Sequence, residues 1–114
     1  MTVGKTGLTQ DEAKQQGYSV IAVTSHSLNK PKFMGGKPIV IKIIADKENG
    51  RLLGAQVIGY EGVDKRLDIL VSAITLNGKA EDLMYMDLAY SPPYSNSRDP
   101  IYYAAVKLIL ALEK

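Results

Sequence analysis

The spacing of hydrophobic residues predicts a chain that contains both strands and helices. Ile39, Ile41 and Ile43 recur at every second position, and Val40 and Ile44 make the other face of the same segment partly apolar. This pattern predicts an interior strand. The predicted strands are 18–24, 38–45 and 51–60, and the predicted helices are 10–16, 62–77, 80–84 and 99–113. Residues 1–8 form a short leading segment without a predicted element, and residues 25–37 form a polar connection.

Local sequence signals define the ends of several elements. Thr9 precedes Glu12 by three positions, which is the capping-box pattern at the start of a helix. Asn49-Gly50 predicts a tight turn between two strands, because both residues tolerate a positive φ. Asp99-Pro100 has the residue types of a helix N-cap and first helical position. The last helix is therefore expected to begin at this dipeptide.

The last predicted helix is apolar on almost every side. Between Pro100 and Leu112 its only charged residue is Lys107. A helix of this kind is buried or covered by a partner, and one small sheet cannot cover both of its sides. We therefore predict an α+β domain with an antiparallel sheet of three or more strands, which self-associates through this helix and part of helix 62–77. The alternative is a helix buried in the core of one subunit.

Composition narrows the class of protein. The 114 residues suit one domain, and a hydrophobic content of 46% argues against disorder. The net charge of +2 is too small to indicate nucleic acid or a membrane surface as a partner. The absence of cysteine excludes disulfides, thiolate metal sites and thiol redox chemistry within the chain. No apolar run reaches the roughly 18–20 residues of a membrane span, and we expect a cytoplasmic protein.

Motifs of self-sufficient catalysis are missing from the sequence. It contains no dinucleotide-binding glycine motif, P-loop or zinc-protease motif. His26 is the only histidine, and a lone histidine at a strand end is more often structural or solvated than catalytic. Lys30, Lys32 and Lys37 make the connection 25–37 basic, which indicates a solvated loop or, as an alternative, a contact for a phosphate-bearing ligand. The isolated chain is therefore not expected to be an active enzyme.

The segment from Asp87 to Pro100 is the strongest candidate for a functional site, and we call it the arm. Pro92 and Pro93 fix two successive φ angles, so the segment is expected to be stiff and extended. Tyr90 and Tyr94 flank the prolines, and a phenol can donate a hydrogen bond or act as a weak acid. The alternative for both tyrosines is packing with a satisfied hydroxyl group.

Four blocks of the sequence, in this order, resemble one known family. They are Gly7–Tyr18, Lys42–Gln56, Gly62–Asp68 and Asp87–Pro100. Together they resemble the C-terminal dimerisation domain of FAD-dependent pyridine nucleotide-disulfide oxidoreductases, in the branch of coenzyme A-disulfide reductases and NADH oxidases. The resemblance implies that residues 1–114 are a single dimerisation domain of a longer flavoprotein. The FAD and NAD(P)H domains of that parent enzyme would lie upstream, and the isolated chain would hold no cofactor.

The same resemblance assigns roles within the arm. In such homodimers the arm reaches the partner's flavin and redox-cysteine site, where Tyr90 and Tyr94 would contact the substrate or the reactive sulfur. Ser91, Pro92 and Pro93 would lie near the partner's flavin. Relatives of the glutathione reductase branch carry a catalytic histidine in this region, and this sequence has none. The single-cysteine branch is therefore favoured, with coenzyme A disulfide, oxygen, peroxide and polysulfide all open as acceptors and NADH or NADPH as donor.

A second interpretation belongs to a different class of function. The arm and the basic connection 25–37 would together form a stand-alone binding module for a coenzyme A-like or nucleotide ligand. The dimerisation interpretation predicts a dimer without intrinsic flavin, whereas the binding module predicts saturable binding by the isolated chain.

Overall fold

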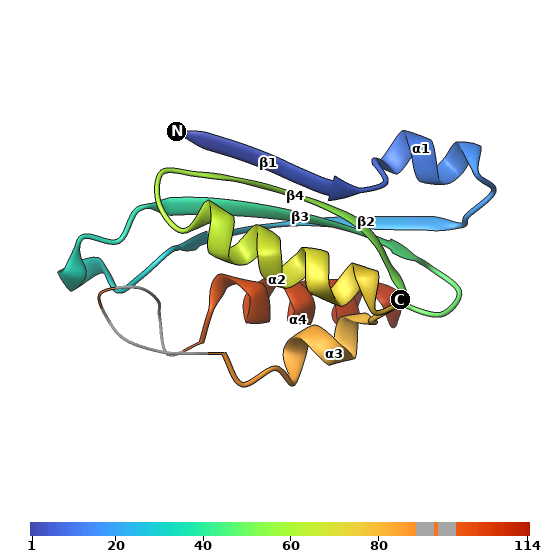
Figure 1. Ribbon diagram of the computed structural model, residues 1–114. Helices are drawn as coiled ribbons and strands as arrows, with labels where there is room; N and C mark the ends of the chain where they lie inside the picture. The colour runs from blue at the N-terminus through green and yellow to red at the C-terminus, as the bar shows by residue number, and fades with distance from the viewer. Residues whose placement is uncertain (89–92, 94–97) are drawn as a thin grey trace.

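A computed structural model describes residues 1–88, 93 and 98–114 of the protein (Figure 1). Its elements, in chain order, are β1 (Thr2–Gly7), α1 (Gln10–Gln15), β2 (Val20–Leu28), the 3-10 helix η1 (Lys32–Met34), β3 (Pro38–Asp46), β4 (Leu52–Gly59), α2 (Val63–Thr75), α3 (Ala80–Met84) and α4 (Pro100–Leu112). The described strands form one sheet in the order β1-β4-β3-β2, and every neighbouring pair is antiparallel. The predicted α+β class with an antiparallel sheet is confirmed.

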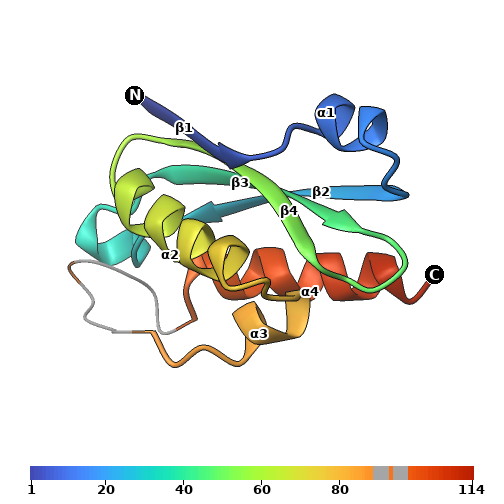
Figure 2. The same ribbon diagram turned by 45° about the vertical axis from the view of Figure 1, so that its right-hand side comes forward.

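The helices divide unequally between the two faces of the sheet. Helix α2 packs over β1 and β4, helix α4 packs over β2 and β3, and α3 lies against α4 on the same side. The short helix α1 lies near one end of the other face (Figures 1 and 2). Most of that other face has no helix of the described chain upon it, so the fold is two-layered over most of its area.

Two apolar clusters hold these layers together. Ile39, Ile41 and Ile43 of β3 point into the main cluster, where they meet Leu70 of α2 and Leu108 of α4. The second cluster lies under α1. It is built from Ala13, Ile44 and Leu53, with Leu8, Tyr18, Val20 and Ala22 packed around them. Strand β3 thus has apolar residues on both faces and lies inside the sheet, as its pattern predicts.

Strand β1 corrects the interpretation of residues 1–8 as a segment without structure. Thr2 to Gly7 pair with β4 along their whole length, so four strands form the sheet and the first precedes α1. Gly4 and Gly7 lower the strand propensity of the segment, yet packing and backbone geometry favour glycine at both positions. A Cβ at Gly4 would lie 2.6 Å from Leu67 of α2, and Gly7 has a φ of +66°.

One strand boundary and one turn also differ from the sequence prediction. Strand β2 runs to Leu28, so His26 lies within a strand and not in the connection. Between β3 and β4 only Gly50 has a positive φ. Asn49 instead accepts a hydrogen bond from the Arg51 N–H at 2.9 Å through its side chain. In this turn Asn49 therefore contributes its side-chain oxygen, and Gly50 alone contributes a left-handed backbone.

Gly54 of β4 is expected to be intolerant of a side chain. A Cβ there would lie 1.8 Å from the backbone oxygen of Leu8, whereas the nearest atoms at Gly59 are 3.2 Å away. Gly54→Ala should lower the free energy of unfolding by about 1–3 kcal/mol, because the connection that holds α1 must move. Urea unfolding of Gly54→Ala and Gly59→Ala checks this. Equal losses in both variants would contradict the steric explanation.

Candidate functional site

The arm lies mostly outside the described residues. Tyr90, Ser91, Pro92 and Tyr94 fall in the undescribed ranges 89–92 and 94–97, so their predicted roles stay predictions. Pro93 is described and exposed. It borders a hollow of about 270 Å³ whose other walls come from the end of β2 and the start of α2, at Asn29, Glu61, Gly62, Asp64, Lys65 and Arg66.

The C-terminal end of the arm is anchored at the first turn of α4. Asp99 is the N-cap, and its Oδ1 accepts a hydrogen bond from the Ile101 N–H at 3.0 Å. Pro100 is the first helical residue, so the predicted cap is confirmed. The Arg98 guanidinium lies 4.7 Å from the centre of the Tyr102 ring, and its Nη1 donates to the Tyr102 hydroxyl at 2.6 Å. Side chains on both sides of the cap thus support this turn.

Arg66 is the functional candidate that sequence reasoning missed. It stands beside Asp64, Lys65 and Asp68 at the polar start of helix 62–77, yet its side chain has no exposed surface. It donates to both carboxylate oxygens of Asp99, from Nε at 3.3 Å and from Nη2 at 3.0 Å. A signal was present, because Val63, Arg66, Leu70 and Ala73 form the buried stripe at helical spacing. An arginine on such a stripe predicts a buried acidic partner.

The basic connection is largely neutralised. Lys30 and Lys37 both pair with Glu61, at 3.1 and 3.4 Å. Asn29 closes the same loop by accepting the Lys37 N–H at 2.7 Å and donating to Glu61 at 3.3 Å. Among the described residues, only Lys32 of the three lysines has no acidic partner. The arrangement favours a structural loop over the predicted contact with a phosphate-bearing ligand.

The Glu61 carboxylate makes this loop sensitive to acid. Its hydrogen bond and ion pair with Lys30, followed by the contacts with Lys37, lower the pKa of Glu61 below its ordinary value. The stability that these Glu61 contacts contribute is therefore present above the unfolded-state pKa of about 4.3. It is lost as the pH falls through the folded-state pKa. Carboxyl NMR titration should show the lowered pKa, and Lys30→Met should move it upward. An unchanged pKa in that variant would contradict the assignment.

Helix α4 has one buried and one exposed apolar face. Ile101, Ala104, Ala105 and Leu108 are buried against the sheet, while Tyr103 is 48% exposed and Leu110 is 56% exposed. Lys107 bends toward β2 and donates to the Thr24 backbone oxygen. On α2, Val71 is 36% exposed, although it lies at helical spacing with Leu67 and Ile74. The alternative of a fully buried core helix is therefore wrong. We call Tyr103 and Leu110, together with Val71 and Leu76 at the C-terminal end of α2, the helix surface.

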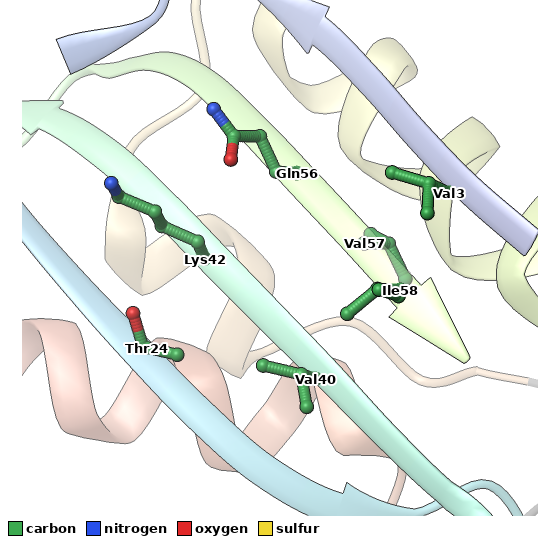
Figure 3. A pocket seen from close by; sticks show the side chains of 7 residues that line it. All are labelled: Val3, Thr24, Val40, Lys42, Gln56, Val57 and Ile58. Atoms are coloured by element: carbon green, nitrogen blue, oxygen red, sulfur yellow. The ribbon is translucent and has the colours of Figure 1, made fainter.

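The opposite face of the sheet carries a separate apolar hollow of about 240 Å³ (Figure 3). It is lined by Val3, Thr24, Val40, Lys42, Gln56, Val57 and Ile58. Register places Val3, Ile58 and Val40 in one row across β1, β4 and β3. The sheet separates this hollow from α4, so it contains none of the predicted site residues.

Neither hollow fits a flavin or a dinucleotide. Both are smaller than the roughly 300–1,000 Å³ of ordinary small-molecule sites. Within residues 1–88, 93 and 98–114, no group of three histidine or acidic side chains could hold a metal ion. Nor does any helix in that part of the chain have the length and apolar character needed to cross a membrane.

Comparison with known proteins decides the family. Residues 1–100 match the family described as "Pyridine nucleotide-disulphide oxidoreductase, dimerisation domain". The chain belongs to this family. The dimerisation domain is 38% identical over 89% of its length to a NAD(P)H sulfur oxidoreductase (CoA-dependent) of Pyrococcus furiosus, of which it covers 23%. It is 33% identical over 88% of its length to a coenzyme A disulfide reductase of Staphylococcus aureus, again covering 23% of that protein.

A solved structure supports the same placement. The dimerisation domain superposes on reduced CoADR-RHD of Bacillus anthracis with a TM-score of 0.92 and 31% identity, over 97% of this chain and 20% of that one. The predicted family, in the branch of coenzyme A-disulfide reductases, is confirmed. The dimerisation domain spans less than a quarter of the length of these relatives.

Proposed function

We propose that residues 1–114 are the dimerisation domain of a longer flavoprotein that oxidises NAD(P)H. The domain would pair two subunits and bring the arm of one subunit to the flavin and redox-cysteine site of the other. There, Tyr90 and Tyr94 would contact the substrate or reactive sulfur, and Ser91, Pro92 and Pro93 would lie near the flavin. The family match over residues 1–100 supports this proposal.

The observation that carries the pairing role is the helix surface. Tyr103 and Leu110 are separated by two helical turns and lie on one side of α4, both about half exposed. Leu76, just after α2, is 79% exposed. Exposed large apolar side chains on both helices indicate an interface, and a second copy of the domain presents the same residues. We propose that α4 and α2 pair two copies through this surface.

The dimer is tested by sedimentation equilibrium of the chain over a wide concentration range. Leu110→Lys should raise the dissociation constant of the dimer by about 30-fold or more, because a charge is placed on the pairing surface of both subunits. Val3→Lys is the matched control, since Val3 is also exposed but lies on the opposite face of the sheet.

The two variants separate the possible interfaces. If Val3→Lys weakens the dimer and Leu110→Lys does not, the pairing surface is the open face of the sheet and the helix proposal fails. A monomer at every concentration would remove the pairing role of the isolated chain. The binding-module interpretation would then be tested by titration with coenzyme A.

The proposed role of the arm predicts a specific loss of turnover. In the full-length flavoprotein, Tyr94→Phe should lower kcat with coenzyme A disulfide by about 10–100-fold, the effect of removing one hydrogen bond in a buried site. Tyr60→Phe is the control, because it removes an exposed phenol of the same domain outside the arm and the helix surface. Flavin content and dimer assembly should not change in either variant. Unchanged turnover in Tyr94→Phe would mean that the side chain of Tyr94 has only a packing role.

A further inference from the structure

The buried pair of Arg66 and Asp99 ties together three segments that are distant in the sequence. The Arg66 guanidinium donates to Asp99 at the start of α4, and from Nη2 to the Asn29 backbone oxygen at 2.8 Å at the end of β2. Nη1 donates to the Gly62 oxygen at 3.3 Å. Asp99 is only 5% exposed, and its carboxylate also caps α4. One ion pair therefore fixes the first turn of α4 against the sheet.

The surrounding backbone leaves room for this guanidinium. Gly62 has a φ of +74°, and a Cβ at that position would lie 2.1 Å from Nη1 of Arg66. The planar fork of arginine can reach both carboxylate oxygens and a carbonyl at once, which a lysine ammonium group cannot do in the same geometry. Gly62 and Arg66 thus fit each other, and a lysine would not reproduce the same set of contacts.

Stability alone does not explain such a pair. Burying two charges costs as much as their attraction returns, and well-packed apolar residues of similar volume often serve a fold equally well. An ion pair with fixed geometry also holds the segments that it joins in one defined relative position. Here the position that it fixes is the point at which the arm joins α4.

The arm meets this pair at two of its residues. Asp99, the second-last residue of the arm, is itself a member of the ion pair. Pro93 borders the hollow that is also lined by Arg66 and Gly62. Tyr94 lies between them in the sequence, directly after Pro93 and five positions before Asp99. Five residues span at most about 18 Å. A fixed Asp99 therefore limits where the Tyr94 side chain can reach.

We propose that Arg66, acting through Asp99, is a positioning residue for the arm and thereby for the tyrosine that enters the partner's site. This inference rests on the proposed function, but the anchoring itself can be measured without it. Arg66 would touch neither substrate nor cofactor. It would hold the first turn of α4 in place, so that the arm leaves the subunit at a fixed point.

Trypsin cleavage of the 114-residue chain tests the anchoring. The bond after Arg98 can enter a protease only if Asp99 and the first turn of α4 detach, whereas the bond after Lys42 in the interior strand β3 opens only on global unfolding. Arg66→Lys should raise the rate at Arg98 relative to the rate at Lys42 by about tenfold, the effect of losing part of a charged hydrogen-bond set. Asp99→Asn, which keeps an N-cap, should do the same.

Leu53→Ala is the control variant, because it destabilises the second cluster, far from the ion pair. It should raise both cleavage rates in proportion. If Arg66→Lys also raises both in proportion, the pair is an ordinary part of the core and the positioning role is overturned. The proposed function would be untouched by that outcome.

Turnover of the full-length flavoprotein provides the second readout. Arg66→Lys should lower kcat about tenfold with flavin content and dimer assembly unchanged, and Arg66→Lys combined with Tyr94→Phe should be no slower than Tyr94→Phe alone. That non-additivity is expected when one residue acts through another. Additive losses, or normal turnover of Arg66→Lys beside an impaired Tyr94→Phe, would overturn the positioning role. Normal turnover of Tyr94→Phe would instead overturn the proposed function of the arm.

Discussion

Arg66→Met is expected to lower the free energy of unfolding by about 3–5 kcal/mol, because it leaves the buried Asp99 carboxylate without its main partner. Methionine fills a similar volume, so the loss reports the unpaired charge more than a cavity. The Asn29 backbone oxygen would lose its hydrogen bond at the same time. Urea unfolding, monitored by circular dichroism, measures the change.

Lys65→Met serves as the matched control for Arg66→Met. Lys65 is the preceding residue, its side chain is 32% exposed, and its Nζ lies 3.9 Å from the Asp99 carboxylate. A longer contact from a partly exposed lysine contributes less, about 0–1 kcal/mol. If the two variants lose equal stability, the fully buried guanidinium is not what balances Asp99. Adding Asp99→Asn to Arg66→Met should recover part of the loss, because the unpaired charge is then removed.

Leu108→Ala is expected to cost about 2–5 kcal/mol of unfolding free energy, the range for a buried leucine whose removal leaves a cavity. Leu108 has no exposed surface and joins α4 to the main cluster against β3. The variant should melt at a lower temperature with an unchanged fold at 20 °C. Thermal and urea unfolding of the chain measure the loss.

Leu110→Ala in the same helix is the control for Leu108→Ala. Its side chain is 56% exposed, so within one subunit the change should stay near 0.5 kcal/mol or below. The comparison has to be made at concentrations where the chain is monomeric, because Leu110 belongs to the proposed pairing surface. Equal losses in the monomer would mean that α4 is not oriented as described.

Hydrophobic periodicity was sufficient to predict most of the sheet and the helices on it. Ile39, Ile41 and Ile43 alternate cleanly, and the strand they form differs by only one residue from its predicted end. Capping chemistry was equally informative. Both hydrogen bonds of the Thr9 capping box are present, and Asp99 caps α4. These signals are local, so tertiary packing had little opportunity to override them.

The sequence was misleading where tertiary packing outweighs local preference. Gly4 and Gly7 made β1 look unstructured, because the reason for glycine at position 4 is a leucine of α2 that is 63 positions away. Arg66 stands among the charged residues at the polar start of α2, and its partner Asp99 lies 33 positions further along the chain. Neither contact could be found from residue type alone, although the position of Arg66 on the buried stripe was a usable indication.

The candidate site was likewise predicted in part from local sequence signals and in part required the three-dimensional structure. The arm was identified from its prolines and tyrosines, and its anchor at Asp99 was predicted as a helix cap. The ion pair behind that anchor required three-dimensional structure, since it joins α2, α4 and the end of β2. For the basic connection 25–37, the sequence left a solvated loop and a ligand contact open, because Glu61, which neutralises two of its lysines, belongs to another segment.

The strand order β1-β4-β3-β2 has a consequence for the route by which the chain folds. β2, β3 and β4 join through short connections, so their pairing closes small loops. β1 pairs with β4 across a much longer separation, from Thr2 to Gly59. Closing a long loop costs more chain entropy and delays contact formation. β1 is therefore expected to be the last strand to join the sheet, and the edge of β4 stays open to other strands until it does.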